Sequence, residues 1–151
     1  VFRVSSDEAV DLGCLDGRIG DNGIEDVNAF SWVERINLLG TYAGERNVGV
    51  GSEGLPEAKE DAWTIFWDKK PLVLKQELEV IVQNEDGSTE NRVLPAGTEL
   101  IPQETDKETY LDAETSDGTR CRIEVETEDG YTYMIHGVDE HAYFADLPYA
   151  G

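Results

Sequence analysis

Two Asp-Gly pairs stand twelve residues apart in the stretch TSDGTRCRIEVETEDGY (115–131), with a cysteine between them. Asp-Gly can open a calcium loop, a twelve-residue segment of alternating oxygen ligands that ends in a bidentate Glu. With Asp117 as the first loop position, Glu128 falls on the twelfth, but a threonine and a cysteine take positions three and five. Arg122 takes the sixth position, where the sharp turn requires glycine. The stretch therefore lacks the ligand set of a calcium loop, and both Asp-Gly pairs are predicted to be hairpin turns.

Other metal ligands and nucleophiles are sparse. The two histidines, His136 and His141, match neither a zincin helix nor a zinc ribbon, and the acidic segment 16–26 has no calcium-loop register, so no metal or cofactor is predicted. Cys121 and His136 could form a thiol and its base. The segment YMIHG resembles the His-Gly segment of L,D-transpeptidases, but there the histidine precedes the cysteine, and here the order is reversed. GVGSEG (49–54) lacks both the strand and helix around a serine nucleophile elbow and the lysine of a phosphate-binding loop. The sequence thus predicts no catalytic residue.

The chain has only two cysteines, Cys14 and Cys121. Two are too few for a zinc site or a disulfide framework. They form either one long-range disulfide in an exported protein or two buried free thiols.

Aromatic residues are the remaining candidates for a ligand site, because aromatic side chains on a strand surface can form a shallow groove for peptides or glycans. Trp63 and Trp67 are four residues apart and would share one face of a strand. The other candidates stand beside turns. The predicted ligand-binding residues are Trp63, Trp67, Tyr110, Tyr143 and Tyr149. The alternative is that most aromatics form the core of two small β-modules; Tyr131 and Tyr133 are predicted to be core residues.

The elements that would position these residues are clearest in the second half. In 119–128, Cys121, Ile123, Val125 and Thr127 alternate with charged residues, which indicates a half-buried antiparallel strand with a charged outer face. This alternation turns Cys121 toward the apolar side, where a thiol is usually inert. Further strands, separated by turn residues, are predicted at 78–83, 89–94, 98–102, 109–115 and 131–137. The Asp86–Gly87 pair is predicted to be the turn that follows the strand at 78–83.

The first half is less regular. Short strands are predicted at 2–4, 9–15 and 62–67. The segment 24–39 fits both a helical period and a period of two, and the flanking turn signals favour a strand. The Gly-rich segment 40–61 is predicted to be a loop or linker, and 68–71 a junction.

The formal net charge of −21 excludes several partners. A field of this sign repels phosphate backbones, so nucleic-acid binding is not expected, and anionic membrane surfaces are disfavoured for the same reason. No apolar run reaches the roughly 20 residues of a membrane span. The chain begins at Val and shows no signal peptide, so it is interpreted as a mature or trimmed chain. The expected location is extracytoplasmic, with the protein either secreted or lipid-anchored through a removed N-terminal segment.

Three segments carry a resemblance to a known family: VLPAGTELIP (93–102), TDKETYLDAETSDGT (105–119) and YTYMIHG (131–137). They resemble, in this order, the motifs of the bacterial SH3-like domain over residues 72–151. VFRVSSDEAVDLGCLDG (1–17) and YFADLPYAG (143–151) resemble the corresponding parts of exported Clostridia-type proteins of unknown function. This resemblance implies an extracytoplasmic, anchored protein and transfers no catalytic residue.

We therefore expect an all-β chain, with a short β-rich module in residues 1–70 and a small SH3-like barrel in residues 71–151. The expected function is a non-catalytic extracytoplasmic binding module for a cell-wall glycan, a peptide or a surface protein. The alternatives are a structural segment of a larger lipoprotein without a ligand of its own, and a cell-wall hydrolase or transpeptidase.

Overall fold

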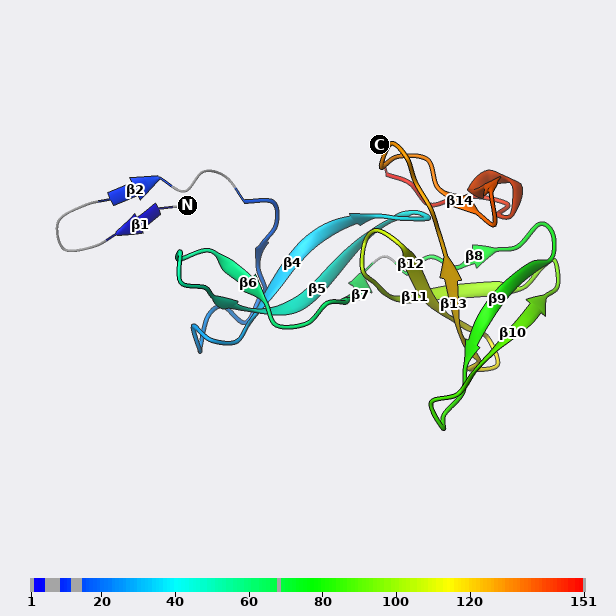
Figure 1. Cartoon of the computed structure of the whole chain (residues 1–151), viewed down its shortest axis with the longest axis horizontal. Helices are drawn as coiled ribbons and strands as arrows, with labels where there is room; N and C mark the ends of the chain where they lie inside the picture. Colours follow the sequence, from blue (N-terminus) through cyan, green and yellow to red (C-terminus); the bar gives the residue numbers. More distant parts are fainter. Residues whose placement is uncertain (1, 5–8, 12–14, 68, 151) are drawn as a thin grey trace. The chain divides into compact units, whose positions relative to one another are not determined.

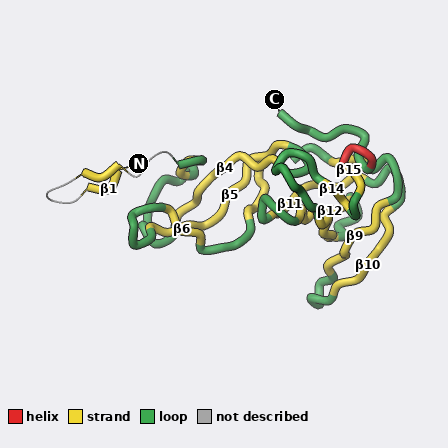
Figure 2. The backbone as a smooth tube through the Cα atoms, turned by 45° about the horizontal axis from the view of Figure 1, so that its top comes forward, coloured by secondary structure: helices red, strands yellow, loops and turns green. Residues whose placement is uncertain are grey.

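The computed structural model of the chain describes residues 2–4, 9–11, 15–67 and 69–150, and these residues form an all-β structure (Figure 1). Fifteen strands and a single 3₁₀ helix, η1 (Glu140–Ala142), are present in these residues. Figure 2 shows that strands and their connecting loops make up the tube, with η1 as the helical segment. The prediction of an all-β chain is confirmed.

The described chain divides into two compact units. The first comprises residues 1–34 and 45–61, and the second comprises residues 35–44 and 62–151. The end of the hairpin formed by β4 (Phe30–Asn37) and β5 (Thr41–Val50) thus belongs with the C-terminal residues, and so does β7 (Trp63–Trp67). The sequence predicts a boundary between residues 70 and 71, whereas this division assigns residues 35–44 and 62–70 to the second unit.

The first unit is built from short antiparallel pairs. β1 (Phe2–Val4) pairs with β2 (Ala9–Asp11), β3 (Arg18–Ile19) pairs with β4, and β6 (Pro56–Ala58) pairs with β5. The prediction of a loop over 40–61 is wrong, because β5 occupies ten of these residues. The glycines in β5 mark close contacts instead of flexibility: a Cβ at Gly49 would lie 2.7 Å from the carbonyl oxygen of Asn28.

The second unit contains an antiparallel sheet in the order β10-β9-β13-β12-β11-β7, with β8 (Leu72–Val73) also paired to β11. The sheet strands are β9 (Leu78–Gln83), β10 (Thr89–Leu94), β11 (Glu99–Thr105), β12 (Tyr110–Thr115) and β13 (Arg120–Glu124). β10 and β11, though consecutive, are not neighbours in this order, so the sheet stays open between them and no closed barrel is present in the described residues.

Two of the predicted Asp-Gly turns close hairpins of this sheet. In each turn the glycine after the aspartate has a positive φ, 83° at Gly87 and 85° at Gly118, a conformation that glycine adopts without steric strain. The N–H of each glycine donates a hydrogen bond to the carbonyl of the residue three positions earlier, which is Asn84 in the first turn and Thr115 in the second. The predicted hairpins β9–β10 and β12–β13 are confirmed.

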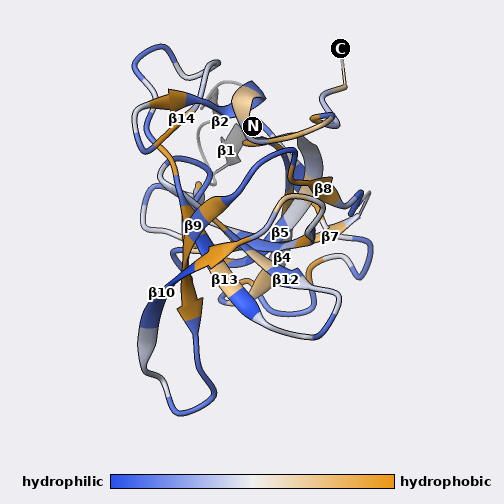
Figure 3. Ribbon diagram, turned by 90° about the vertical axis from the view of Figure 1, so that its right-hand side faces the viewer, coloured by the Kyte–Doolittle hydropathy of each residue, from blue (hydrophilic) through white to orange (hydrophobic). Residues whose placement is uncertain are grey.

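The alternation predicted for β13 is also confirmed. Cys121, Ile123 and Val125 are buried, while Arg122 and Glu124 lie on the other face. Bands of hydrophobic and hydrophilic residues along β9 and β13 can be followed in Figure 3. The inward residues of β9, β12 and β13 are buried and belong to the core, and every outward residue of these strands keeps some exposure to solvent. We call this second side the outer face.

The C-terminal part departs from its predicted strand over 131–137. β14 is only Met134–Ile135, paired with β15 (Val138–Asp139). Tyr133 is buried as predicted, but the prediction of a core position for Tyr131 is wrong, since its side chain is 84% exposed. The Asp129 carboxylate accepts hydrogen bonds from the backbone N–H groups of Tyr131 and Thr132, which folds these residues into a turn and ends the alternation.

Candidate functional site

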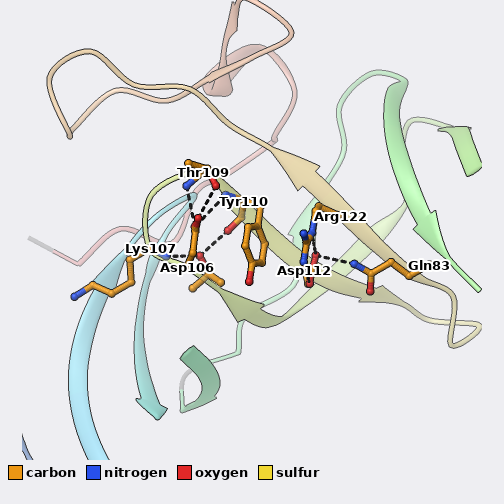
Figure 4. Close-up of polar contacts among 8 residues, drawn as sticks. Gln83, Asp106, Lys107, Thr109, Tyr110, Asp112 and Arg122 are labelled. Atoms are coloured by element: carbon orange, nitrogen blue, oxygen red, sulfur yellow. Dashed lines mark hydrogen bonds and ion pairs between the residues drawn. The ribbon is translucent and has the colours of Figure 1, made fainter. Parts of the chain in front are cut away.

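Four polar residues from three strands meet on the outer face. Tyr110 and Asp112 come from β12, Arg122 from β13 and Gln83 from β9. Strand pairing brings them together: Asp112 stands opposite Arg122, and Arg122 stands opposite Ile81, two residues from Gln83 on the same face. We call these four residues the Arg122 cluster (Figure 4).

The Arg122 cluster is held by short polar contacts. Arg122 donates two hydrogen bonds to Asp112, Nε to Oδ1 and Nη2 to Oδ2, both at 2.7 Å. Gln83 donates a further hydrogen bond of 3.2 Å to Asp112 Oδ1. The guanidinium carbon of Arg122 lies 3.6 Å from the centroid of the Tyr110 ring, within cation–π distance. A planar guanidinium is thus fixed between a carboxylate and an aromatic ring.

Two groups of the cluster, Arg122 and Tyr110, have shifted pKa values. The hydrogen bonds that Arg122 donates to Asp112 raise the pKa of Arg122 above its ordinary value, so the guanidinium stays charged. Burial raises the pKa of the Tyr110 hydroxyl, which stays protonated at neutral pH. Neither Arg122 nor Tyr110 therefore exchanges a proton near pH 7.

A turn before β12 positions Tyr110. Asp106 Oδ1 accepts hydrogen bonds from the backbone N–H groups of Glu108 (2.9 Å), Thr109 (2.8 Å) and Tyr110 (3.2 Å), as Figure 4 shows in part. Partial burial raises the pKa of Asp106, but the hydrogen bonds from Thr109 and its neighbours outweigh this and leave the pKa below its ordinary value. An ionised Asp106 therefore fixes the start of β12.

Carboxylates surround the Arg122 cluster. Glu104 of β11 stands opposite Asp112, and Glu124 of β13 stands opposite Tyr110. Glu114 extends the outer face along β12. Since cross-strand neighbours lie on one face with Cβ atoms about 5 Å apart, this face carries more negative than positive charge around its fixed aromatic group. Such a surface favours a cationic ligand.

The thiol–imidazole pair considered from the sequence is not assembled. Cys121 is fully buried, and burial, with the nearby Asp112 charge, raises the pKa of its thiol to about 11. A thiol in this state is a poor nucleophile. His136 Nε2 lies 3.0 Å from the carbonyl oxygen of Glu79 and is engaged there. Cys14 lies outside the described residues, while Cys121 is a free thiol.

The five predicted aromatic residues do not form one groove. Trp63 is 2% exposed and belongs to the core, so the prediction that it binds a ligand is wrong; Trp67, at the end of the same strand, is 69% exposed. Trp63 stands opposite the buried Thr105 on the neighbouring strand, so both side chains point inward. Buried and exposed residues alternate along β7 from Trp63, but this alternation ends before Trp67. Tyr110 is the predicted aromatic that enters the Arg122 cluster.

Tyr143 and Tyr149 lie in the C-terminal segment. Tyr143 is half-buried and its carbonyl accepts a hydrogen bond from Lys75 N–H. The Tyr149 hydroxyl lies 3.0 Å from both carboxylate oxygens of Glu140, to which it donates. Glu140 is 1% exposed, and this burial raises its pKa. The Tyr149 hydroxyl is therefore occupied by its hydrogen bonds to Glu140, which hold the C-terminal segment in place.

Sequence reasoning missed three members of the cluster: Gln83, Asp112 and Arg122. A signal for two of them was present, because Asp112 and Arg122 stand five residues before and five after Asp117, the centre of a predicted hairpin turn. Residues equidistant from such a turn face each other across the hairpin, as these two do. No comparable local signal existed for Gln83, which reaches Asp112 through the pairing of β9 with β13.

The described residues contain no group of three or more His, Cys, Asp or Glu side chains that could hold a metal ion. Nor do they contain a helix with the length and apolar character to cross a membrane. Searches against protein-family models, curated proteins and solved structures gave no match for this chain. The resemblance to SH3-like domains stays a prediction.

Proposed function

We propose that this chain is a non-catalytic extracytoplasmic binding module, and that its outer face binds a cationic segment of another surface protein. The observation that carries the proposal is the Arg122 cluster, in which two 2.7 Å hydrogen bonds and a stacked ring hold Arg122 on an accessible sheet face. A rigid, accessible aromatic and polar group is typical of a recognition surface.

Three features support binding over catalysis. The Asp112 oxygens are occupied by Arg122 and Gln83, so this carboxylate is poorly placed to act as a base. The Cys121 thiol is buried, with a raised pKa. The Tyr110 hydroxyl also has a raised pKa. The groups nearest the cluster therefore offer contacts and charge, and no activated nucleophile.

The charge of the chain favours a protein partner over a wall polymer. A net charge of −21 repels anionic wall polymers and accelerates association with a cationic segment. The proposal includes the SH3-like assignment of residues 71–151. It is supported by the antiparallel meander β11–β12–β13, with β9 returning beside β13.

Titration of the full chain with a fluorescent ten-residue lysine peptide tests the proposal. The outer-face variant replaces Glu104, Glu114 and Glu124 with Gln, and we expect it to bind at least tenfold more weakly. A matched control replaces three exposed acids elsewhere in the same unit with their amides, Glu77, Glu128 and Asp146, and carries the same change of net charge. Equal loss in both variants would show a general charge effect and contradict a site on the outer face. Retention of the chain on purified peptidoglycan, together with no peptide binding, would replace the protein partner with a wall glycan.

A further inference from the structure

β10 is the end strand of the sheet in the second unit. It pairs with β9 along its whole length, from Thr89 opposite Gln83 to Leu94 opposite Leu78. Its first five residues, 89–93, are all exposed. An end strand presents unpaired backbone donors and acceptors, which makes it a template for a further strand.

The hairpin turn shows which backbone groups of β10 are free. Asn84 N–H donates to the Ser88 carbonyl, so residues 84 and 88 form a hydrogen-bonded pair. Because hydrogen-bonded and non-hydrogen-bonded pairs alternate in an antiparallel ladder, Glu90 and Arg92 bond to β9, and Leu94 does likewise. The backbone groups of the alternate residues point away from the sheet; they are those of Thr89, Asn91 and Val93.

The sequence of β10 is complementary to itself in one antiparallel register. With Asn91 opposite Asn91 of a second copy, Thr89 stands opposite Val93, and all these residues offer free backbone groups. The same register places Glu90 opposite Arg92 of the second copy, twice by symmetry. Moving the centre by one residue would set Glu90 against Glu90 or Arg92 against Arg92, which is unfavourable.

We propose that β10 is a self-association edge, at which two copies of the chain pair antiparallel about Asn91. Within one chain Arg92 already forms an ion pair with Glu90, so both side chains are close to the edge and can exchange partners at little cost. The pairing uses the sheet edge and is independent of the ligand proposed for the outer face. It gives a two-fold interface, the commonest symmetry of homodimers.

The dimer is expected to be weak. An interface of five-residue strands falls short of the roughly 1,000 Å² typical of stable complexes. Two chains of charge −21 also repel each other at long range. This repulsion is screened at an ionic strength of about 0.3 M, where the Debye length is below about 8 Å. Dimers should therefore form at high protein concentration and moderate salt.

Charge exchange at positions 90 and 92 tests the pairing by analytical ultracentrifugation of the full chain. We expect the average mass of the unaltered protein to rise from 16.8 kDa toward twice that value with concentration. Glu90→Arg or Arg92→Glu alone should weaken dimerisation at least tenfold. The double variant, and an equimolar mixture of the two single variants, should restore it, because opposite charges again face each other.

Net charge alone predicts a different outcome. Glu90→Arg changes the net charge from −21 to −19, since one negative charge is lost and one positive charge is gained, and this would strengthen association. Glu85→Arg in the adjacent turn carries the same charge change and should dimerise at least as well as the unaltered protein. The proposal is overturned if the unaltered protein stays monomeric, if Glu90→Arg dimerises like Glu85→Arg, or if the double variant is not restored while circular dichroism shows it folded.

Crosslinking provides a direct test of the register. In a background with Cys14→Ser, Asn91→Cys should form disulfide-linked dimers on mild oxidation, because opposite Cα atoms in such a pair are about 5.5 Å apart. Asp86→Cys, in the exposed turn of the same hairpin, should crosslink at least tenfold more slowly. Equal rates would overturn the register about Asn91.

Discussion

Replacing Arg122 with Met removes the guanidinium at the centre of the cluster and keeps the length of the side chain. The change deletes both 2.7 Å hydrogen bonds to Asp112, whose side chain is only 15% exposed. Breaking an exposed pair costs about 0.2–1 kcal/mol and breaking a fully buried one about 3–5 kcal/mol. This half-buried pair lies between these limits, so we expect a loss of about 2 kcal/mol in the free energy of unfolding.

The interaction energy between Arg122 and Asp112 can be isolated with a double-mutant cycle of Arg122→Met and Asp112→Ala, measured by urea denaturation. We expect a coupling energy of about 1–2 kcal/mol that changes little with salt, because partly buried pairs are screened weakly. A loss of 2 kcal/mol corresponds to a decrease in Tm of roughly 8–16 °C for a unit of this size.

The next pair on the same two strands provides the control. Arg120 and Glu114 are 3.8 Å apart, with side chains 66% and 38% exposed, and their cycle should give a coupling below about 0.5 kcal/mol. If both cycles give the same coupling, or if Arg122→Met leaves stability unchanged, the view of the cluster as a rigid, preformed surface is refuted.

Three further predictions concern local structure. Asp106→Ala removes three hydrogen bonds to backbone N–H groups and should cost about 2 kcal/mol in urea denaturation at pH 7. Because the pKa of Asp106 is lowered in the folded state, the stability difference between the unaltered protein and the variant should be present above about pH 4 and decrease as the pH falls further. A stability difference that stays constant with pH would contradict an ionised Asp106 in this turn. The pKa of Glu140 is raised in the folded state, so the unaltered protein should lose stability as the pH rises above about 4.3. Glu140→Gln should remove this part of the pH dependence of Tm. Identical pH profiles of Tm for the two proteins would count against a buried ionised Glu140. Gly44→Ala places a Cβ 2.1 Å from Ile36 Cδ1 and should cost about 1–3 kcal/mol, part of which Ile36→Val should recover in the double variant; no recovery would show another cause.

Several features of the second unit followed from neighbouring residues and were predictable. The Asp-Gly pairs at 86–87 and 117–118 close hairpins, because glycine at positive φ needs no tertiary support. The alternation along β13 placed Cys121 in the core, and thereby removed the thiol as a catalytic candidate. These predictions hold because turn chemistry and a period of two act over a few residues.

The Gly-rich segment 40–61 shows where this reasoning fails. Glycine is typical of loops, yet Gly44 lies in β5, where its missing side chain makes room for the buried Ile36. The partner that requires glycine there is on another strand. Composition alone cannot distinguish a flexible glycine from one at a close contact, because both appear as the same letter.

What the sequence by itself determined is the all-β class, the hairpin turns and the inward or outward direction of alternating residues. Only the tertiary structure decided which strands became neighbours, and with them the site. Gln83 meets Asp112 across 29 positions, and Tyr133 donates to the Asn37 carbonyl across 96. Strand order likewise left β10 at the edge of the sheet. Turns and alternation depend on forces between adjacent residues, whereas strand order depends on burying the apolar face of the whole sheet, which no local segment contains.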